Sequence, residues 1–132
     1  MRTHLVFRNA ALTDPDADDA NPAGAKLARL VADHLPVHGF PVKRVVQEDW
    51  GWAVVTDNPC FGLWIGCGAD IDRPNGHLCF IEPSRPWIRR WFRRVDTTAT
   101  IARLAAALET IAAEAAGTSE LRWWSEDEVR QQ

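Results

Sequence analysis

The chain contains no tyrosine, a single methionine and only three cysteines, and it has no long apolar run. No stretch reaches the roughly eighteen apolar residues of a membrane span, and residues 1–12 lack the apolar core and cleavage site of a secretory signal. An odd cysteine count in such a chain favours reduced thiols over a disulfide framework. We therefore expect a cytoplasmic protein that has no membrane partner.

Sequence motifs for several kinds of chemistry are also missing. The chain has no Gly-x-Ser-x-Gly nucleophile elbow, no P-loop and no dinucleotide-binding glycine pattern. Cys60, Cys67, His77 and Cys79 are zinc-ligand types, but their spacing lacks a Cys-x-x-Cys pair. A Cys67–His77 pair across a hairpin would lack a third group to orient it. We expect no cofactor, no metal and no catalytic residue, which favours a protein that is not an enzyme.

Arginine and tryptophan, in contrast, are abundant. The chain has seven tryptophans, and arginine supplies thirteen of the fifteen basic residues. Five arginines and no acidic residue lie in segment 85–95, whereas the rest of the chain holds ten basic and eighteen acidic residues, a net charge of −8. The overall net charge of −3 argues against a general nucleic-acid binder. The molecule is polarised along its sequence.

Short β-rich runs dominate the middle of the chain. Residues 42–49, 52–57, 61–68 and 77–83 are rich in Val, Ile, Phe and Trp and are separated by Gly, Asn, Pro and Asp, which predicts antiparallel strands joined by hairpins. "THLVF" near the N-terminus and "ELRWW" near the C-terminus are candidates for the first and last strand. The sequence therefore predicts a sheet of 4–5 strands.

Apolar residues recur at helical spacing in three places. The pattern predicts helices over 22–35 and 98–116, and a short amphipathic helix within 84–96. Two long amphipathic helices must cover something apolar. We therefore expect one α+β domain over 1–132, a two-layer sandwich with two long helices on one face of the sheet, the other face partly open, and a polar tail at 125–132.

The stretch "QEDWGWAVV" places two carboxylates beside two tryptophans with a glycine between the rings. In a straight strand, Glu48, Trp50 and Trp52 would share one face and Asp49 would point the other way. Gly51 is more simply explained by a bulge or a tight corner. Two interpretations stay open: a structural hairpin with one tryptophan in the core, or a binding edge made by a carboxylate and an exposed tryptophan.

The arginine-rich segment also has two interpretations. On the predicted helix, its arginines would project away from Ile88, Trp91, Phe92 and Val95, and such a cationic face can bind an acidic protein, a nucleic acid or an anionic membrane. Alternatively, the arginines pair with acidic residues of their own chain and stack on tryptophans. The acidic balance of the whole chain places an acidic protein ahead of a nucleic acid or a membrane.

Four motifs together resemble known proteins. "EDWGW" at 48–52, "LWIGCG" at 63–68, "IEPSRPWIRRWF" at 81–92 and "LRWW" at 121–124 are similar to small uncharacterised bacterial α+β proteins, some of them similar to immunity proteins of polymorphic toxin systems. The resemblance implies that the chain binds a toxin domain stoichiometrically. Composition and periodicity alone do not show that role.

The residues themselves favour a protein-binding module, because interfaces are enriched in tryptophan and arginine. The candidate binding residues are Glu48, Asp49, Trp50, Trp52, Trp64, Arg85, Arg89, Arg90, Arg93 and Arg94. The alternative is a small-molecule binder or enzyme that uses the open sheet face, lined by Glu48, Trp52, Trp64 and Glu82. A third hypothesis is a nucleic-acid contact through residues 85–94.

Overall fold

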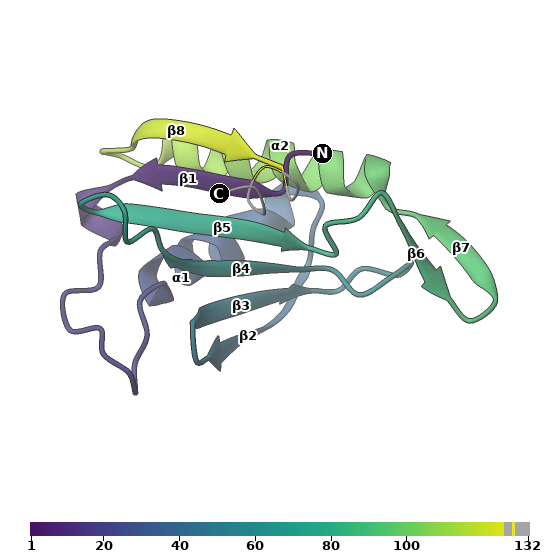
Figure 1. Ribbon diagram of the computed structural model, residues 1–132, viewed down its shortest axis with the longest axis horizontal. Coiled ribbons are helices and arrows are strands. Elements are labelled where there is room, and N and C mark those ends of the chain that lie inside the picture. The colour runs from purple at the N-terminus through teal and green to yellow at the C-terminus, as the bar shows by residue number, and fades with distance from the viewer. Residues whose placement is uncertain (126–127, 129–132) are drawn as a thin grey trace.

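The structure is a computed structural model that describes residues 1–125 and residue 128. It consists of a six-stranded antiparallel sheet in the order β2-β3-β4-β5-β1-β8, with both helices on one side (Figure 1). The strands are β1 (His4–Arg8), β2 (Val42–Glu48), β3 (Gly51–Thr56), β4 (Trp64–Ala69), β5 (Gly76–Glu82) and β8 (Ser119–Trp124). The helices are α1 (Ala25–His34) and α2 (Thr98–Glu114). The predicted α+β class is confirmed, and the polar tail lies mostly outside the described residues.

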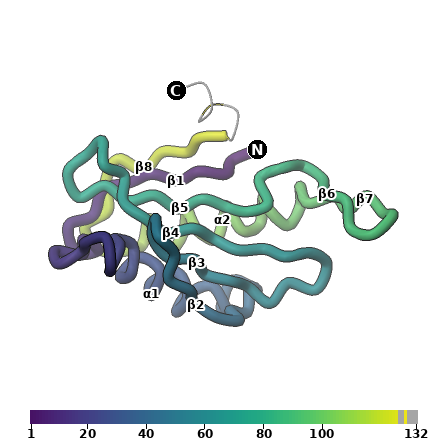
Figure 2. The backbone as a smooth tube through the Cα atoms, turned by 60° about the horizontal axis from the view of Figure 1, so that its bottom comes forward, coloured from purple at the N-terminus to yellow at the C-terminus, as the bar shows by residue number. Residues whose placement is uncertain are grey.

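The sheet has more strands than the 4–5 predicted, because both terminal candidates join it. β1 inserts between β5 and β8 and pairs antiparallel with each. Only one of the two predicted long helices is long, since α1 has 10 residues and α2 has 17. Figure 2 shows the two helices together beneath the sheet. No helix in the described part of the chain is long and apolar enough to cross a membrane.

The start of α1 differs from the sequence prediction, which began this helix at residue 22. The helix begins after Gly24, whose φ of 113° lies in the left-handed region that favours glycine. A Cβ at Gly24 would collide with the carbonyl oxygen of Cys67 in β4. The chain therefore enters α1 where its backbone touches the sheet, which local sequence signals do not reveal.

The predicted apolar stripe of α2 forms the helix side of the core. Ile101, Leu104, Leu108 and Ile111 are each no more than 4% exposed, as the spacing indicates. At the start of the helix, the Asp96 carboxylate accepts a hydrogen bond from the Thr98 N–H at 2.8 Å, which lowers the pKa of that carboxyl. Side chains from the helix-facing side of the sheet complete the core: Leu5, Phe7, Val54, Ile65, Cys67, Cys79 and Ile81.

The helix predicted within 84–96 is wrong. The segment forms a β-hairpin, β6 (Trp87–Arg90) and β7 (Arg93–Asp96), which pairs only with itself. Its pattern is a palindrome about Trp91–Phe92, so Ile88 faces Val95 and Arg90 faces Arg93 across the two strands. We call residues 87–96 the basic hairpin. It projects beyond the end of the sheet (Figure 1).

Candidate functional site

The sheet face opposite the helices carries a cluster of aromatic rings. The rings of Trp50, Trp64 and Phe80 lie 5.1 to 6.1 Å apart between centroids, and His4 stacks on Phe80 at 5.9 Å. We call these four side chains the aromatic face. Such distances are those of packed aromatic pairs, so the rings support one another as a continuous apolar surface.

A glycine in β4 creates the floor of the aromatic face. Gly66 lies opposite Phe80 in the β4–β5 register, and a Cβ at this position would collide with the Phe80 ring. The ring therefore lies flat on bare backbone, which compensates for the missing side chain in the strand. Sequence reasoning missed Phe80 and His4, although each directly adjoins a core residue of its strand, Cys79 and Ile81 in β5 and Leu5 in β1, and alternation therefore places them on the opposite face.

The stretch "QEDWGWAVV" forms a tight hairpin and not a straight strand. Glu48 pairs with Gly51, so Asp49 and Trp50 are the two loop residues between β2 and β3. A Cβ at Gly51 would collide with the Cys67 carbonyl oxygen, so the glycine allows the corner to press onto β4. This brings Trp50 over the uncovered face, where it is 46% exposed.

The two tryptophans of that stretch have different roles. Trp52 pairs with Cys67 and therefore points to the helix-covered side, where it packs against the core. Its Nε1 donates a hydrogen bond to the Pro22 carbonyl oxygen at 3.0 Å. Trp52 thus does not join Trp50 and Trp64, and it cannot line the open face as the small-molecule alternative requires. The structure places one tryptophan of the stretch against the core and leaves the other exposed, and the binding edge stays a prediction.

The acidic candidates lie at the edge of the aromatic face. Glu48 and Asp49 are exposed at the β2–β3 corner beside Trp50. Glu82 is half-buried at the end of β5, opposite Trp64 in the register. The carboxylates therefore rim the aromatic surface, and no enclosed pair of them forms an acid–base site in the described residues.

The arginine candidates belong to a second surface. Arg85, Arg89, Arg90, Arg93 and Arg94 are all exposed, and within residues 1–125 none of them forms an ion pair with a carboxylate. The Arg90 guanidinium donates to the Cys60 carbonyl oxygen at 2.6 Å, and Arg94 stacks on the Trp87 ring at 4.3 Å. The predicted ion pairs of these arginines with acidic residues of their own chain are thus not formed within residues 1–125, whereas the predicted stacking on tryptophan is formed by Arg94 and Trp87.

Two of the three thiol candidates, Cys67 and Cys79, lie with His77 inside the core, whereas Cys60 is exposed. Cys67 lies opposite Cys79 on neighbouring strands, and a hydrogen bond to Cys79 together with burial raises the pKa of the Cys67 thiol. A raised pKa disfavours the nucleophilic thiolate. His77 is buried, and its Nε2 lies 2.7 Å from the carbonyl oxygen of Asn9. The Cys67–His77 pair is therefore not formed, and no group of three metal-ligating side chains gathers in the described residues.

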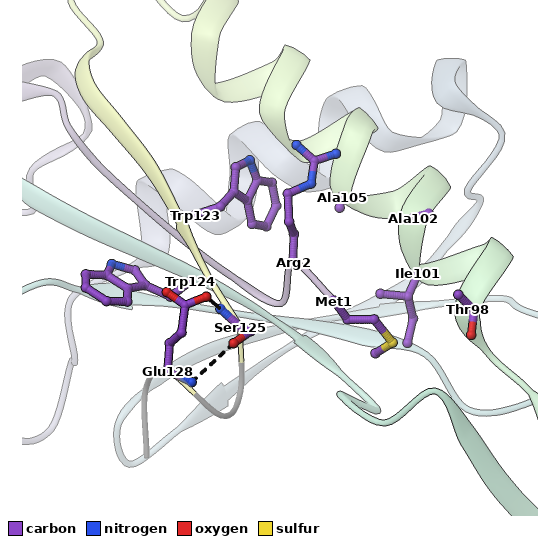
Figure 3. Close-up of a pocket in the computed structure, with 10 residues that line it drawn as sticks. All are labelled: Met1, Arg2, Thr98, Ile101, Ala102, Ala105, Trp123, Trp124, Ser125 and Glu128. Atoms are coloured by element: carbon purple, nitrogen blue, oxygen red, sulfur yellow. Dashed lines mark hydrogen bonds between the residues drawn. The ribbon is translucent and has the colours of Figure 1, made fainter. Parts of the chain in front are cut away.

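Two hollows lie near the ends of β1 and β8. The larger, about 420 Å³, lies beside α2 (Figure 3), and its lining includes Arg2, Ile101, Trp123 and Ser125. The smaller, about 310 Å³, adjoins the aromatic face at His4. Its polar lining residues are Asp70, Asp72, Arg73 and Arg122. Arg73 is already held by Asp70, at 3.1 Å, so the charges that line this hollow are partly paired with one another.

Comparison with protein-family models, with curated proteins and with solved structures found no match to this chain.

Proposed function

We propose that this chain is a non-enzymatic module that binds another protein through the aromatic face, with Trp50 as its centre. The supporting observation is the position of Trp50, a large side chain 46% exposed on a sheet face that neither α1 nor α2 covers. Tryptophan at a central, partly exposed position is the side chain most enriched at the energetic centres of interfaces.

The surroundings of Trp50 suit a protein partner better than a small ligand. Trp64 and Phe80 extend the apolar surface across two strands, and Glu48 and Asp49 supply a charged rim. An apolar centre with a polar rim is the ordinary anatomy of a protein interface. The resemblance to immunity proteins implies the same kind of role, stoichiometric binding of a toxin domain.

A small-molecule site is the second candidate, favoured by the smaller hollow. This hollow brings His4 and Trp124 together with two arginines and two aspartates. Binding of a small charged ligand there would be lost in Arg122→Ala and retained in Trp50→Ala. That pattern separates the two candidates, because the protein-binding proposal predicts the opposite pattern.

The proposal is tested by affinity capture from the native host with the wild-type chain, Trp50→Ala and Val37→Ala. Val37 is also an exposed apolar residue, but it lies in the turn after α1, away from the aromatic face. We expect a saturable, stoichiometric partner that Trp50→Ala loses and Val37→Ala keeps, with all three proteins equally folded by circular dichroism. Capture that both variants retain, or the lack of any saturable partner, would count against the proposal.

A further inference from the structure

The tip of the basic hairpin presents two large apolar side chains to solvent. Trp91 is 85% exposed and Phe92 is 98% exposed, and they are the two loop residues between β6 and β7. Within the described residues neither ring contacts another ring or a cation. Apolar exposure of this kind on a soluble domain marks an interaction site more often than a fold requirement.

The fold gains nothing from a tryptophan at this turn. Trp91 adopts a φ of 58°, a left-handed conformation that bulky side chains rarely take and that glycine takes freely. A sequence selected only for a stable hairpin would place glycine or asparagine there. The tryptophan is therefore kept at the tip in spite of its backbone cost.

The same holds for the arginines behind the tip. Arg89 lies opposite Arg94, and Arg90 lies opposite Arg93. Like charges directly opposite each other destabilise a strand pair. An anionic surface brought against the hairpin would relieve this repulsion, because it would neutralise four neighbouring guanidinium groups at once.

The order of side chains along the basic hairpin, apolar at the tip and cationic behind it, matches the layers of an anionic lipid bilayer. Two aromatic side chains stand at the tip, a ring of arginines follows, and the rest of the chain carries a net charge of −8. We propose that the basic hairpin docks the protein onto an anionic lipid bilayer, with Trp91 and Phe92 in the headgroup region and the arginines on lipid phosphates. Aromatic side chains favour that interface, and arginines reach phosphates while their stems stay apolar.

The geometry favours a bilayer over the other anionic partners. A protein partner would need a pocket that matches a convex two-residue tip, and a bilayer needs none. Binding of single-stranded nucleic acid uses a positively charged groove that follows the backbone, whereas the basic hairpin is a convex projection (Figure 1). The expectation of no membrane partner rested on the lack of a membrane-spanning run and on the acidic balance of the whole chain, and neither excludes contact through an exposed hairpin tip.

The acidic residues outside the basic hairpin determine how the protein is oriented on the bilayer. An anionic bilayer repels it, so the projecting hairpin is the part that approaches the surface (Figure 1). The docking contact lies on a different surface from Trp50 and does not depend on the proposed protein partner.

The test is co-sedimentation with vesicles of mixed phosphatidylglycerol and phosphatidylcholine, compared with phosphatidylcholine alone, at low and high salt. We expect binding to the anionic vesicles that falls as salt rises. Replacement of both tip residues by serine, Trp91→Ser with Phe92→Ser, lowers the partition coefficient more than tenfold. Arg89→Gln with Arg93→Gln lowers it roughly 25-fold, since each arginine near an anionic surface contributes about fivefold.

Two controls make the result specific to the hairpin. Arg29→Gln with Arg44→Gln removes the same charge from exposed sites outside the hairpin, and Trp50→Ser removes an exposed tryptophan from the aromatic face. Both are expected to bind as the wild type does. No binding to anionic vesicles at low salt, equal loss in the controls, equal binding to phosphatidylcholine alone, or displacement of the vesicles by an oligonucleotide would overturn the proposal.

Discussion

The two faces of the sheet bury their large apolar side chains to different degrees. On the helix-covered face, Phe7 and Ile65 are sealed beneath α1 and α2 and have no measurable exposure. On the other face, Phe80 rests on bare glycine backbone, and Trp50 closes over it while staying half in solvent. One face thus holds the fold together, and the other presents rings that the fold does not need to bury.

The largest expected difference compares the same side chain on neighbouring strands. Phe7→Ala removes a fully buried ring and should lower the free energy of unfolding by about 3–5 kcal/mol. Phe80→Ala removes a partly buried ring from the next strand and should cost less, because part of that ring already contacts water. Urea unfolding of both variants measures the two values. Equal losses would mean that the two faces are equally buried.

The next largest effect on stability is expected at Gly66, the glycine beneath the Phe80 ring. Gly66→Ala places a Cβ in the space of the Phe80 ring and should cost about 1–3 kcal/mol of stability through overpacking. Gly62→Ala is the matched control, since no atom lies within 4 Å of the added Cβ. In the double variant Gly66→Ala, Phe80→Ala the two costs should not add, because removal of the ring frees the space. Additive costs in urea unfolding would contradict this packing.

The Cys67 thiol, buried on the helix-covered face, predicts that the free energy of unfolding depends on pH. Because the native pKa of Cys67 is raised, the unfolded thiol ionises first, and above its ordinary value of 9.0 the unfolded state holds fewer protons. Stability is therefore complete below that pH and falls above it by up to about 1.4 kcal/mol per pH unit. Cys67→Ala should flatten the slope of unfolding free energy between pH 8 and pH 10. An unchanged slope would show that other groups cause the loss.

The smallest expected effect concerns the hairpin. Trp91→Gly relieves the positive φ and removes no contact, so it should change the free energy of unfolding by less than about 1 kcal/mol. The same variant should bind anionic vesicles more weakly. A large loss of stability in thermal unfolding would mean that Trp91 supports the fold and is not kept for a surface.

The sequence predicted those parts of the fold that depend on local patterns. Leu27, Val31 and the α2 stripe are buried as their spacing indicates, and the runs at 42–49 and 77–83 are strands. The insertion of β1 between β5 and β8 is a non-local pairing that no local pattern encodes.

The sequence and the structure differ in two places at the candidate site, the helix within 84–96 and the shared face of Trp50 and Trp52, for a common reason. Apolar residues at 87, 88, 91, 92 and 95 fit a helical period, but they also fit a palindrome about a two-residue turn, and tryptophan, isoleucine, phenylalanine and valine favour strands. Trp50 and Trp52 would share a face only in a straight strand that continued from Glu48, but a turn at residues 49–50 interrupts that strand. In both places the position of a turn decided which side chains reach solvent.

The most direct test of the central claim is ¹⁹F NMR of protein labelled with 5-fluorotryptophan, with each resonance assigned by single substitution and a soluble paramagnetic agent added. The structure predicts strong relaxation of Trp91 and Trp50 and weak relaxation of Trp52, the ring that packs against the core. If Trp50 proved as protected as Trp52, the aromatic face would be closed, and its proposed role in binding would be contradicted.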